Sequence, residues 1–286
     1  MKLGVLSDIH GNYEAFKTCI DYLKKREVDA FVLLGDYVGE LPCPEKSLEL
    51  LKNLQKENNC YIIRGNKEDY ILQGIGGEHP EWDDYPSVVG MLRYGFEHCT
   101  QEDKEYFDSL PITDVINIEG YPAVRICHGT VEKTNAKMEK ESEEAVLSIA
   151  EDYILCGHTH RQKTIEIGKK HIFNPGSVGL VVDEGKDANC MILHGTNTGW
   201  EPEYLEVPYD VEAEIESMKK EGLFTIAPCW SVATEAALRG KKVYHSRVLS
   251  YAMNLCEKEQ GSCEWPKVPE EYMRMALEEM IYKKES

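Results

Sequence analysis

Long hydrophobic runs are missing from this sequence, and none approaches the ~20 apolar residues that a membrane-spanning helix requires. The first residues also lack the basic segment, the long apolar core and the small-residue cleavage site of a secretory signal, so we interpret them as the first strand of the fold. The 10 cysteines include no Cys-x-x-Cys pair, and their spacing does not suggest a zinc site. We therefore expect a cytoplasmic protein with reduced thiols and no membrane association.

Basic residues are scarce as well. The chain has 32 lysines and arginines against 51 aspartates and glutamates, which gives a formal net charge of −19. A field of this sign repels nucleic acid and anionic membranes, so it counts against a nucleic-acid partner. It also repels phosphate-bearing substrates unless cations offset it locally. Bound divalent metal ions would do so, because they are the largest local charges in such sites.

The length of 286 residues permits one large α/β domain with a modest extension, or two small domains. Short apolar segments rich in β-formers alternate with amphipathic helical patterns, which is typical of an α/β fold that opens with a parallel sheet. The expected strands are 3–6, 30–34, 60–64, 123–127, 153–156, 171–174 and 190–194. The expected helices are 13–25, 47–57, 91–109, 139–150, 211–220, 232–238, 243–255 and 269–284.

Seven polar side chains follow these strands at the point where each strand ends. They are Asp8, His10, Asp36, Asn66, His128, His158 and His160. Sites in α/β proteins form beyond the carboxyl ends of the strands, so these side chains are expected to converge on one face. Their mixture of carboxylate, carboxamide and imidazole suits divalent ions such as Mn, Fe, Co, Ni or Zn. One aspartate can bridge two ions held ~3.5–4 Å apart.

Each of these residues also has an ordinary interpretation when it is taken alone. An Asp-x-His or a His-x-His after a strand is usually just a turn. Asn66 would serve as a simple turn residue in the left-handed backbone conformation. The prediction of a metal site therefore depends on all seven occurring together, in order, each at a strand end.

The motifs around these residues resemble those of the calcineurin-like metallophosphoesterase superfamily, in particular its small prokaryotic phosphodiesterase and phosphatase branch. They are SDIHGN at 7–12, GDY at 35–37, RGN at 64–66, CHGT at 127–130, GHTH at 157–160 and NPGSVG at 174–179. The resemblance covers residues 1–222. It implies an α/β fold with two mixed β-sheets flanked by helices, in an αββα sandwich. Residues 223–286 would then form a helical C-terminal extension.

The resemblance also implies a division of the seven ligands between two metal ions, with Mn as the first choice. Position by position, Asp8, His10 and His160 would hold the first ion. Asn66, His128 and His158 would hold the second, and Asp36 would bridge the two. A water or hydroxide between the ions would then attack the phosphorus of a small phosphate ester. The predicted catalytic residues are Asp36, His128 and Lys67.

Lys67 marks a departure from the family pattern, because many relatives have a histidine directly after the Asn of the GN motif. Lysine can donate a hydrogen bond and offer charge, but its ordinary pKa of ~10.4 makes it a poor acid at neutral pH. Lys67 is therefore a candidate acid. The alternative is a solvated loop residue that pairs with Glu68 or Asp69.

Three further polar residues are predicted to bind substrate, each with a structural alternative. Asn12 would contact phosphate or cap the next helix. Arg64 would approach the site or form a buried ion pair. Arg161 would reach an anionic substrate or face solvent.

Two segments outside the motifs bear on specificity. Residues 74–90, which include Trp82, are rich in Gly and Pro and are predicted to form a loop at the rim of the active site, with a plain surface excursion as the alternative. The extension carries Trp230, Trp265 and Tyr272. These aromatics are expected to pack on the protein's own core, although covering the cleft or contacting a partner subunit are alternatives.

The function predicted from these features is metal-dependent hydrolysis of phosphomonoesters or phosphodiesters. One alternative is a non-catalytic metal-binding scaffold of the same fold, but such a scaffold has no need of all seven ligands. The other is a nuclease of the same superfamily, against which the net charge of −19 and the lack of a Lys/Arg stripe both count.

Overall fold

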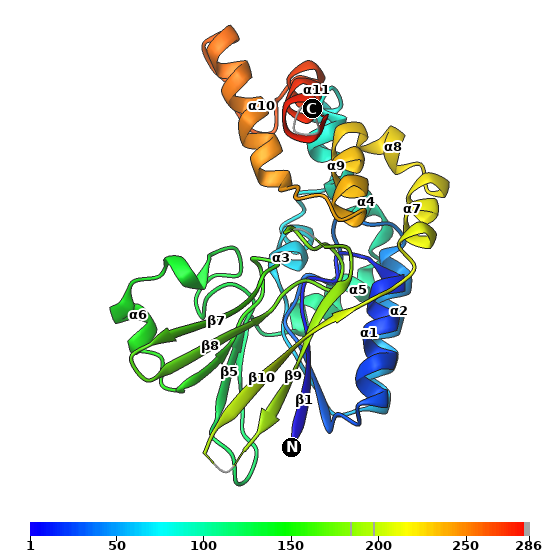
Figure 1. Cartoon of the computed structure of the whole chain (residues 1–286). Helices are drawn as coiled ribbons and strands as arrows, with labels where there is room; N and C mark the ends of the chain where they lie inside the picture. Colours follow the sequence, from blue (N-terminus) through cyan, green and yellow to red (C-terminus); the bar gives the residue numbers. More distant parts are fainter. Residues whose placement is uncertain (184, 197, 283–286) are drawn as a thin grey trace.

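A computed structural model describes residues 1–183, 185–196 and 198–282. Within these residues, ten strands form two five-stranded mixed sheets. Figure 1 shows the two sheets side by side, with helices α1 and α2 along the first sheet, α6 beside the second, and the C-terminal helices beyond one end of both. The predicted α/β sandwich of two mixed sheets with flanking helices and a helical C-terminal extension is confirmed.

The first sheet has the strand order β10-β9-β1-β2-β3. Its strands are β1 (Lys2–Leu6), β2 (Ala30–Leu33), β3 (Cys60–Ile62), β9 (Ala188–Gly195) and β10 (Trp200–Val207). Strands β1, β2 and β3 are parallel, whereas β9 pairs antiparallel with both β1 and β10. The carboxyl ends of β1, β2 and β3 therefore lie at the same edge of this sheet.

The second sheet has the strand order β4-β5-β6-β8-β7. Its strands are β4 (Thr113–Ile116), β5 (Val124–Cys127), β6 (Tyr153–Leu155), β7 (Gln162–Ile167) and β8 (Lys170–Pro175). Strands β5, β6 and β8 are parallel, and β4 and β7 close the two edges in antiparallel pairs.

Side chains alternate between two buried faces along the central strands, because successive residues of a strand point to opposite sides. In β1, Leu3 and Val5 pack between the two sheets, whereas Leu6 faces the helices. In β2, Phe31 and Leu33 likewise face the helices. This double burial explains why the central strands have continuous apolar sequences.

The remaining elements are mostly α-helices. They are α1 (Tyr13–Lys25), α2 (Pro44–Glu57), α3 (Asn66–Leu72), α4 (Pro86–His98), α5 (Gln101–Ser109), α6 (Glu143–Leu147), α7 (Val211–Lys220), α8 (Leu223–Ile226), α9 (Pro228–Leu238), α10 (His245–Gln260) and α11 (Glu270–Leu277). Three short turns complete them: η1 (Pro80–Trp82), η2 (Met138–Lys140) and η3 (Glu278–Tyr282). None of the described helices is both long and apolar enough to span a membrane.

Several predicted element bounds were wrong. The helix expected over 91–109 is two helices, because Thr100 begins α5 with a capping box in which its hydroxyl accepts from the backbone N–H of Asp103. The loop expected over 74–90 ends at residue 85, because α4 begins at Pro86. This loop also contains η1. The helix expected over 139–150 is only the short α6. Of the last predicted helix, residues 283 and 284 lie outside the described part of the chain.

The C-terminal helices share one hydrophobic core with α4 and α7, so both sides of residue 222 contribute to it. Tyr272 of α11 is buried in this core. Glu270, at the start of α11, accepts hydrogen bonds from the backbone N–H of Ser87 at 2.8 Å and from its hydroxyl at 2.6 Å. This contact fixes α11 against α4 and therefore places the C-terminal helices next to the sandwich.

A buried carboxyl group in α7 predicts how the stability of the fold depends on pH. Glu214 is only 2% exposed, and burial raises its pKa to about 8. The folded protein therefore holds a proton that the unfolded chain has released above pH ~4.3. The free energy of unfolding should therefore fall as the pH rises from ~4.3 to about 8, by up to ~1.4 kcal/mol per pH unit.

Replacing Glu214 with glutamine should remove this loss. We expect the melting temperature of the variant to exceed that of the unmodified protein by roughly 5 °C or more at pH 9, and to be about equal to it near pH 4. Differential scanning calorimetry at both pH values measures this. Glu216→Gln, an exposed change on the same helix, is the control, and an equal shift in both variants would contradict the argument.

Candidate metal centre

The seven predicted ligands follow parallel strands at one end of the two sheets, six of them on loops and Asn66 at the start of α3. Asp8 and His10 follow β1, Asp36 follows β2, Asn66 follows β3, His128 follows β5, and His158 and His160 follow β6. The loops are joined by backbone hydrogen bonds: the N–H of His10 donates to the carbonyl of Asp36 at 2.9 Å, and the N–H of Gly157 donates to that of His128 at 2.7 Å. The topology thus brings together residues that are up to 152 positions apart.

Unusual backbone conformations concentrate at these loops. Among the described non-glycine residues with positive φ, five are predicted ligands: Asp8, His10, Asp36, His158 and His160. Their φ angles lie between 52° and 65°, in the left-handed region that costs L-residues energy. Such strain persists only where the surrounding structure enforces it, and it is typical of functional sites.

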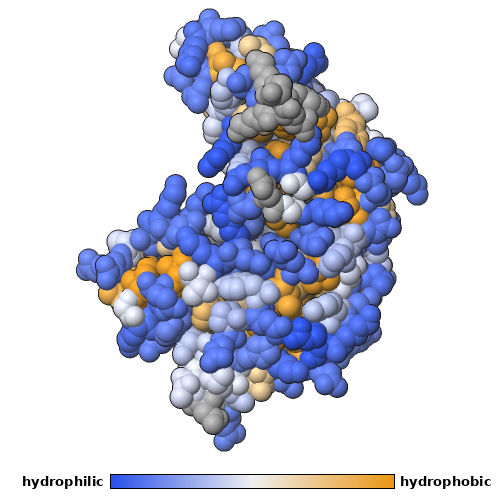
Figure 2. Space-filling model, viewed as in Figure 1, coloured by the Kyte–Doolittle hydropathy of each residue, from blue (hydrophilic) through white to orange (hydrophobic). Residues whose placement is uncertain are grey.

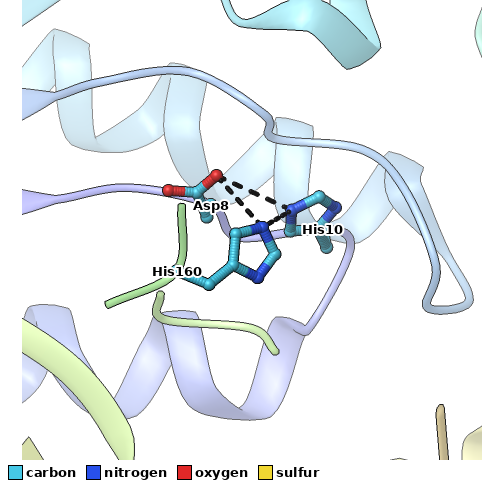
Figure 3. A group of neighbouring side chains, drawn as sticks. All are labelled: Asp8, His10 and His160. Atoms are coloured by element: carbon cyan, nitrogen blue, oxygen red, sulfur yellow. Dashed lines mark hydrogen bonds and ion pairs between the residues drawn. The ribbon is translucent and has the colours of Figure 1, made fainter. Parts of the chain in front are cut away.

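The first group of converging side chains consists of Asp8, His10 and His160, drawn in Figure 3. The Nε2 atoms of His10 and His160 are 3.0 Å apart, and Asp8 Oδ1 lies 3.3 Å from His160 Nε2 and 3.8 Å from His10 Nε2. Asp8 Oδ2 accepts hydrogen bonds from the Ser7 hydroxyl and the backbone N–H of His158. Asp8 Oδ1, in contrast, is buried without a hydrogen-bond partner.

The second group surrounds Asp36, whose Oδ2 lies 3.4 Å from His128 Nε2 and 3.7 Å from His10 Nε2. Asn66 Oδ1 lies 3.2 Å from His128 Nε2 and 2.8 Å from His158 Nδ1. Asp36 therefore stands between the first group and the residues predicted for a second ion.

Contacts behind the imidazoles fix which nitrogen faces the centre. His128 Nδ1 lies 2.7 Å from the carbonyl oxygen of Leu34, and His160 Nδ1 lies 2.6 Å from that of Leu180. A carbonyl only accepts, so each Nδ1 carries a hydrogen and each Nε2 is the nitrogen that faces the centre and can bind a metal ion once it is unprotonated.

The carboxylates and imidazoles of the centre shift one another's pKa values. Burial alone would raise the pKa of Asp8, but His160 and His128 hold it well below its usual range. Burial alone would lower the pKa of His128, but Asp36 and Asp8 raise it to about 9. In this charge state the acidic and imidazole groups stabilise one another. A bound cation would take over that role and displace the protons.

Glu40 joins His10 to Lys67, and sequence reasoning missed it. One carboxylate oxygen lies 2.5 Å from His10 Nδ1, and the other accepts from Lys67 Nζ at 2.5 Å. Lys67 is thus paired with Glu40, not with Glu68 or Asp69. Burial alone would lower the pKa of the Lys67 ammonium, but Glu40 and Asp36 raise it above its ordinary value.

Glu68 was also missed. Its buried carboxylate accepts hydrogen bonds from the backbone N–H groups of Asp36 at 2.9 Å, Tyr37 at 2.7 Å and Gly65 at 2.8 Å. It therefore ties the loop after β2 to the start of α3, and so positions Asp36 and Asn66.

Asn12 and Arg64, two of the predicted substrate-binding residues, make structural contacts instead. Asn12 caps α1 by accepting from the N–H of Ala15, and its amide donates to the carbonyl of Gly179. Arg64 pairs with Asp69 at 2.8 Å and donates to a carbonyl at the end of α5. Neither lines the cavity at the centre, so the alternatives of a helix cap and an ion pair describe their contacts.

A family model for the calcineurin-like phosphoesterase superfamily domain matches residues 1–199, well over half of the chain. The chain belongs to the calcineurin-like phosphoesterase superfamily. The uncharacterized protein MJ0912 of Methanocaldococcus jannaschii is 25% identical over 242 residues, which cover 77% of this chain and 93% of that protein.

Solved structures of two proteins have a similar fold. The hypothetical protein PH1004 of Pyrococcus horikoshii OT3 aligns with a TM-score of 0.68 and 20% identity, over 80% of this chain and 97% of that one. A metallophosphoesterase of Sphaerobacter thermophilus aligns with a TM-score of 0.59 and 20% identity, over 80% of this chain and 99% of that one. At this identity the likeness supports the fold alone.

Calcineurin-like phosphoesterases use divalent metal ions, and the donors of this member fit such an ion. Asp8 Oδ1 is a buried carboxylate oxygen that lacks a hydrogen-bond partner and faces imidazole nitrogens. A buried carboxylate oxygen without a hydrogen-bond donor is costly unless a cation completes its surroundings. Carboxylate, carboxamide and imidazole donors together suit borderline transition metals.

The NPGSVG motif supports the ligand loops from behind. The Ser177 hydroxyl donates to the carbonyl of Asp8 at 2.8 Å, and the Asn174 amide donates to that of Gly157 at 2.7 Å. These contacts explain why the motif accompanies the ligands.

A glycine also allows the backbone of one loop to approach a ligand closely. A Cβ atom on Gly39 would lie 2.2 Å from His10 Nδ1.

A cavity of about 640 Å³ opens from the metal centre. Its polar wall includes Lys67, Lys137 and Arg161. Arg161 donates to Asp183 at 3.0 Å and to the Tyr244 hydroxyl, and is partly exposed. Of the predicted substrate-binding residues, Arg161 is the one that the structure places at the cavity.

Proposed function

We propose that this chain hydrolyses phosphomonoesters or phosphodiesters, using two divalent ions that share Asp36. The observation that carries the proposal is the unmatched Oδ1 of Asp8, which lies within 3.8 Å of imidazole nitrogens in a buried centre. Asp8, His10 and His160 would hold one ion. Asn66, His128 and His158 would hold the other. Manganese is our first choice, with Fe, Zn, Ni and Co as alternatives.

The bound ions would supply an activated water and the positive charge that neutralises the phosphate oxygens. The chain's own residues orient the centre: Leu34 and Leu180 hold two imidazoles, and Glu68 holds the Asp36 loop. Lys67, which lines the cavity next to Asn66, would donate a hydrogen bond to a phosphate oxygen. We assign it this role in place of general acid, because Glu40 already stabilises its charged form.

The structural contacts favour an enzyme over a scaffold that only binds metal. Supporting contacts hold the imidazoles of His10, His128 and His160, and catalysis needs ligands held within a fraction of an ångström. A scaffold, in contrast, has no need of all seven ligands. The net charge of −19 continues to argue against a nuclease.

The cytoplasm remains our predicted location. The supporting observation is that all ten cysteines, each within the described residues, are free thiols. Free thiols persist in reducing compartments.

The proposal predicts that the purified protein binds two equivalents of Mn²⁺ and hydrolyses bis-p-nitrophenyl phosphate. Metal content by mass spectrometry and release of p-nitrophenolate measure the two properties separately. A chelator should abolish the rate, and Mn²⁺ should restore it. A protein that holds both ions but hydrolyses neither this diester nor p-nitrophenyl phosphate would be a scaffold.

A further inference from the structure

The cavity continues from the metal centre into a chamber walled by the C-terminal helices, which lie outside the residues that match the family. Trp230 of α9 and Leu249 of α10 line it on one side, and Met91 and Leu92 of α4 on another. The volume of about 640 Å³ lies within the range of pockets that bind small organic molecules, ~300–1,000 Å³. A phosphoryl group alone would leave most of this space empty.

The chamber wall is mostly apolar. Besides the residues above, it includes Ile71, Ile75, Val88, Leu180, Val182 and Trp265. Figure 2 shows a largely hydrophilic surface on one face of the molecule, with hydrophobic atoms gathered in the helical part among other places. A sugar or peptide in such a chamber would place many of its hydroxyl or amide groups against apolar side chains, at a substantial cost in binding.

Aromatic rings form part of the wall and its rim. The rings of Trp230 and His245 are 4.8 Å apart, and Trp265 meets Trp82 edge-on at 5.5 Å. Trp82 belongs to the segment predicted to rim the site, and His79 stacks on it. Flat aromatic groups pack favourably against rings arranged in this way.

Among the described residues of the helical wall, Trp230 has a polar atom without a hydrogen-bond partner. The indole Nε1 of Trp230 is buried without a hydrogen-bond acceptor. The neighbouring His245 contacts the Thr234 hydroxyl through its Nε2 at 2.9 Å, and no hydrogen bond joins its ring to the indole N–H. A buried N–H donor without a partner is costly, and an acceptor atom on a ligand would satisfy it.

We infer that the substrate is a small phosphoester whose organic group is apolar or aromatic and fills this chamber while its phosphoryl group lies at the metal centre. The inference deepens the proposed function and rests on it. The charge distribution agrees: Lys67, Lys137 and Arg161 offset the anionic phosphoryl group, and the apolar walls receive the neutral part.

Two diesters with the same leaving group test this inference. In methyl p-nitrophenyl phosphate and benzyl p-nitrophenyl phosphate, water adds to phosphorus, the bond to the p-nitrophenyl oxygen breaks, and p-nitrophenolate leaves. Only the apolar group that remains differs. We expect kcat/KM to be at least about tenfold higher for the benzyl ester, because even one methylene in an apolar pocket is worth ~10-fold or more.

Variants of the chamber should reduce this preference. Leu249→Ala should lower the benzyl-to-methyl ratio severalfold. Trp230→Phe, which replaces the indole with a smaller ring and also removes its N–H, is a second variant that should lower the ratio. Leu147→Ala is the matched control, because Leu147 is 41% exposed on α6 and far from the cavity. Equal kcat/KM for both esters, or equal ratios in Leu249→Ala and Leu147→Ala, would overturn the inference.

A binding experiment separates this inference from the proposed hydrolysis. Benzylphosphonate and methylphosphonate, which lack the ester bond, are titrated calorimetrically into the Mn²⁺-loaded protein. Preferential binding of benzylphosphonate that Leu249→Ala reduces would support the chamber, even if no ester were hydrolysed. Hydrolysis of both esters with equal binding of both phosphonates would support the enzyme and refute the chamber.

Discussion

Replacing Asp36 with asparagine is expected to lower the hydrolysis of bis-p-nitrophenyl phosphate by more than about a hundredfold, because even a partner behind a metal ligand is worth ~10–100-fold. Asp36 Oδ2 lies between His10 and His128, at 3.7 Å and 3.4 Å from their Nε2 atoms. The change removes the negative charge that would bridge the two ions. One ion per chain, or fewer, should remain.

Asparagine has nearly the same size and shape as aspartate, so this variant tests the effect of the negative charge alone. Asp36 Oδ1 accepts a hydrogen bond from the backbone N–H of Lys67 at 2.8 Å, and the carboxamide oxygen of asparagine can accept the same bond. The loop should therefore stay in place, which a far-UV circular dichroism spectrum checks. Asp21→Asn, a half-exposed aspartate on α1, is the matched control and should change neither metal content nor rate. Retention of both ions and of the rate by Asp36→Asn would refute the bridging role.

The position of the centre was predictable from the sequence because parallel strands expose their carboxyl ends at one edge. Strands β1, β2 and β5 are mostly apolar because most of their residues are buried, and each strand is followed soon by a polar ligand. The strand-end pattern therefore located the loops, and the resemblance supplied the roles of their side chains.

The strands that sequence reasoning missed are at sheet edges. β4, β7 and β10 each have a neighbour on one side only and are partly exposed, so their apolar pattern is weak. β10 even contains Pro202, which is tolerated at an edge but argues against a central strand. Local sequence does not encode the partner that stabilises such a strand.

The supporting residues of the site were missed for a related reason. Glu40 and Glu68 follow no strand directly, and acidic residues are abundant in this chain, so nothing in the sequence distinguishes them from surface carboxylates. Likewise, Trp230 and Leu249 reach the cavity only because α9 packs on α4, and α10 packs on α9 and α11. These contacts depend on tertiary structure and cannot be derived from strand ends.

A change at Glu40 is predicted to have the second-largest effect on metal binding and activity. Glu40 contacts both the predicted ligand His10 and the ammonium group of Lys67. Replacing it with glutamine should weaken binding of one Mn²⁺ ion by about 10–100-fold, since a carboxylate behind a metal-bound imidazole fixes its orientation and raises its basicity. His10 Nδ1 lies 2.5 Å from this carboxylate. A calorimetric titration with Mn²⁺ should resolve two binding sites, one with weakened affinity and one with unchanged affinity. Glu45→Gln, an exposed change at the start of α2, is the control.

Lys67→Ala separates the two roles of this ion pair. If Lys67 only binds phosphate, the variant should keep both Mn²⁺ affinities and lose about 10–100-fold in kcat/KM, the worth of a charged hydrogen bond of 1.5–3 kcal/mol. The loss should be the same for aryl phosphodiesters whose leaving groups differ in pKa. A loss that grows with leaving-group pKa would instead make Lys67 the proton donor. Because Glu40→Gln removes the carboxylate that stabilises the ammonium, combining it with Lys67→Ala should cost less than the sum of the two single effects.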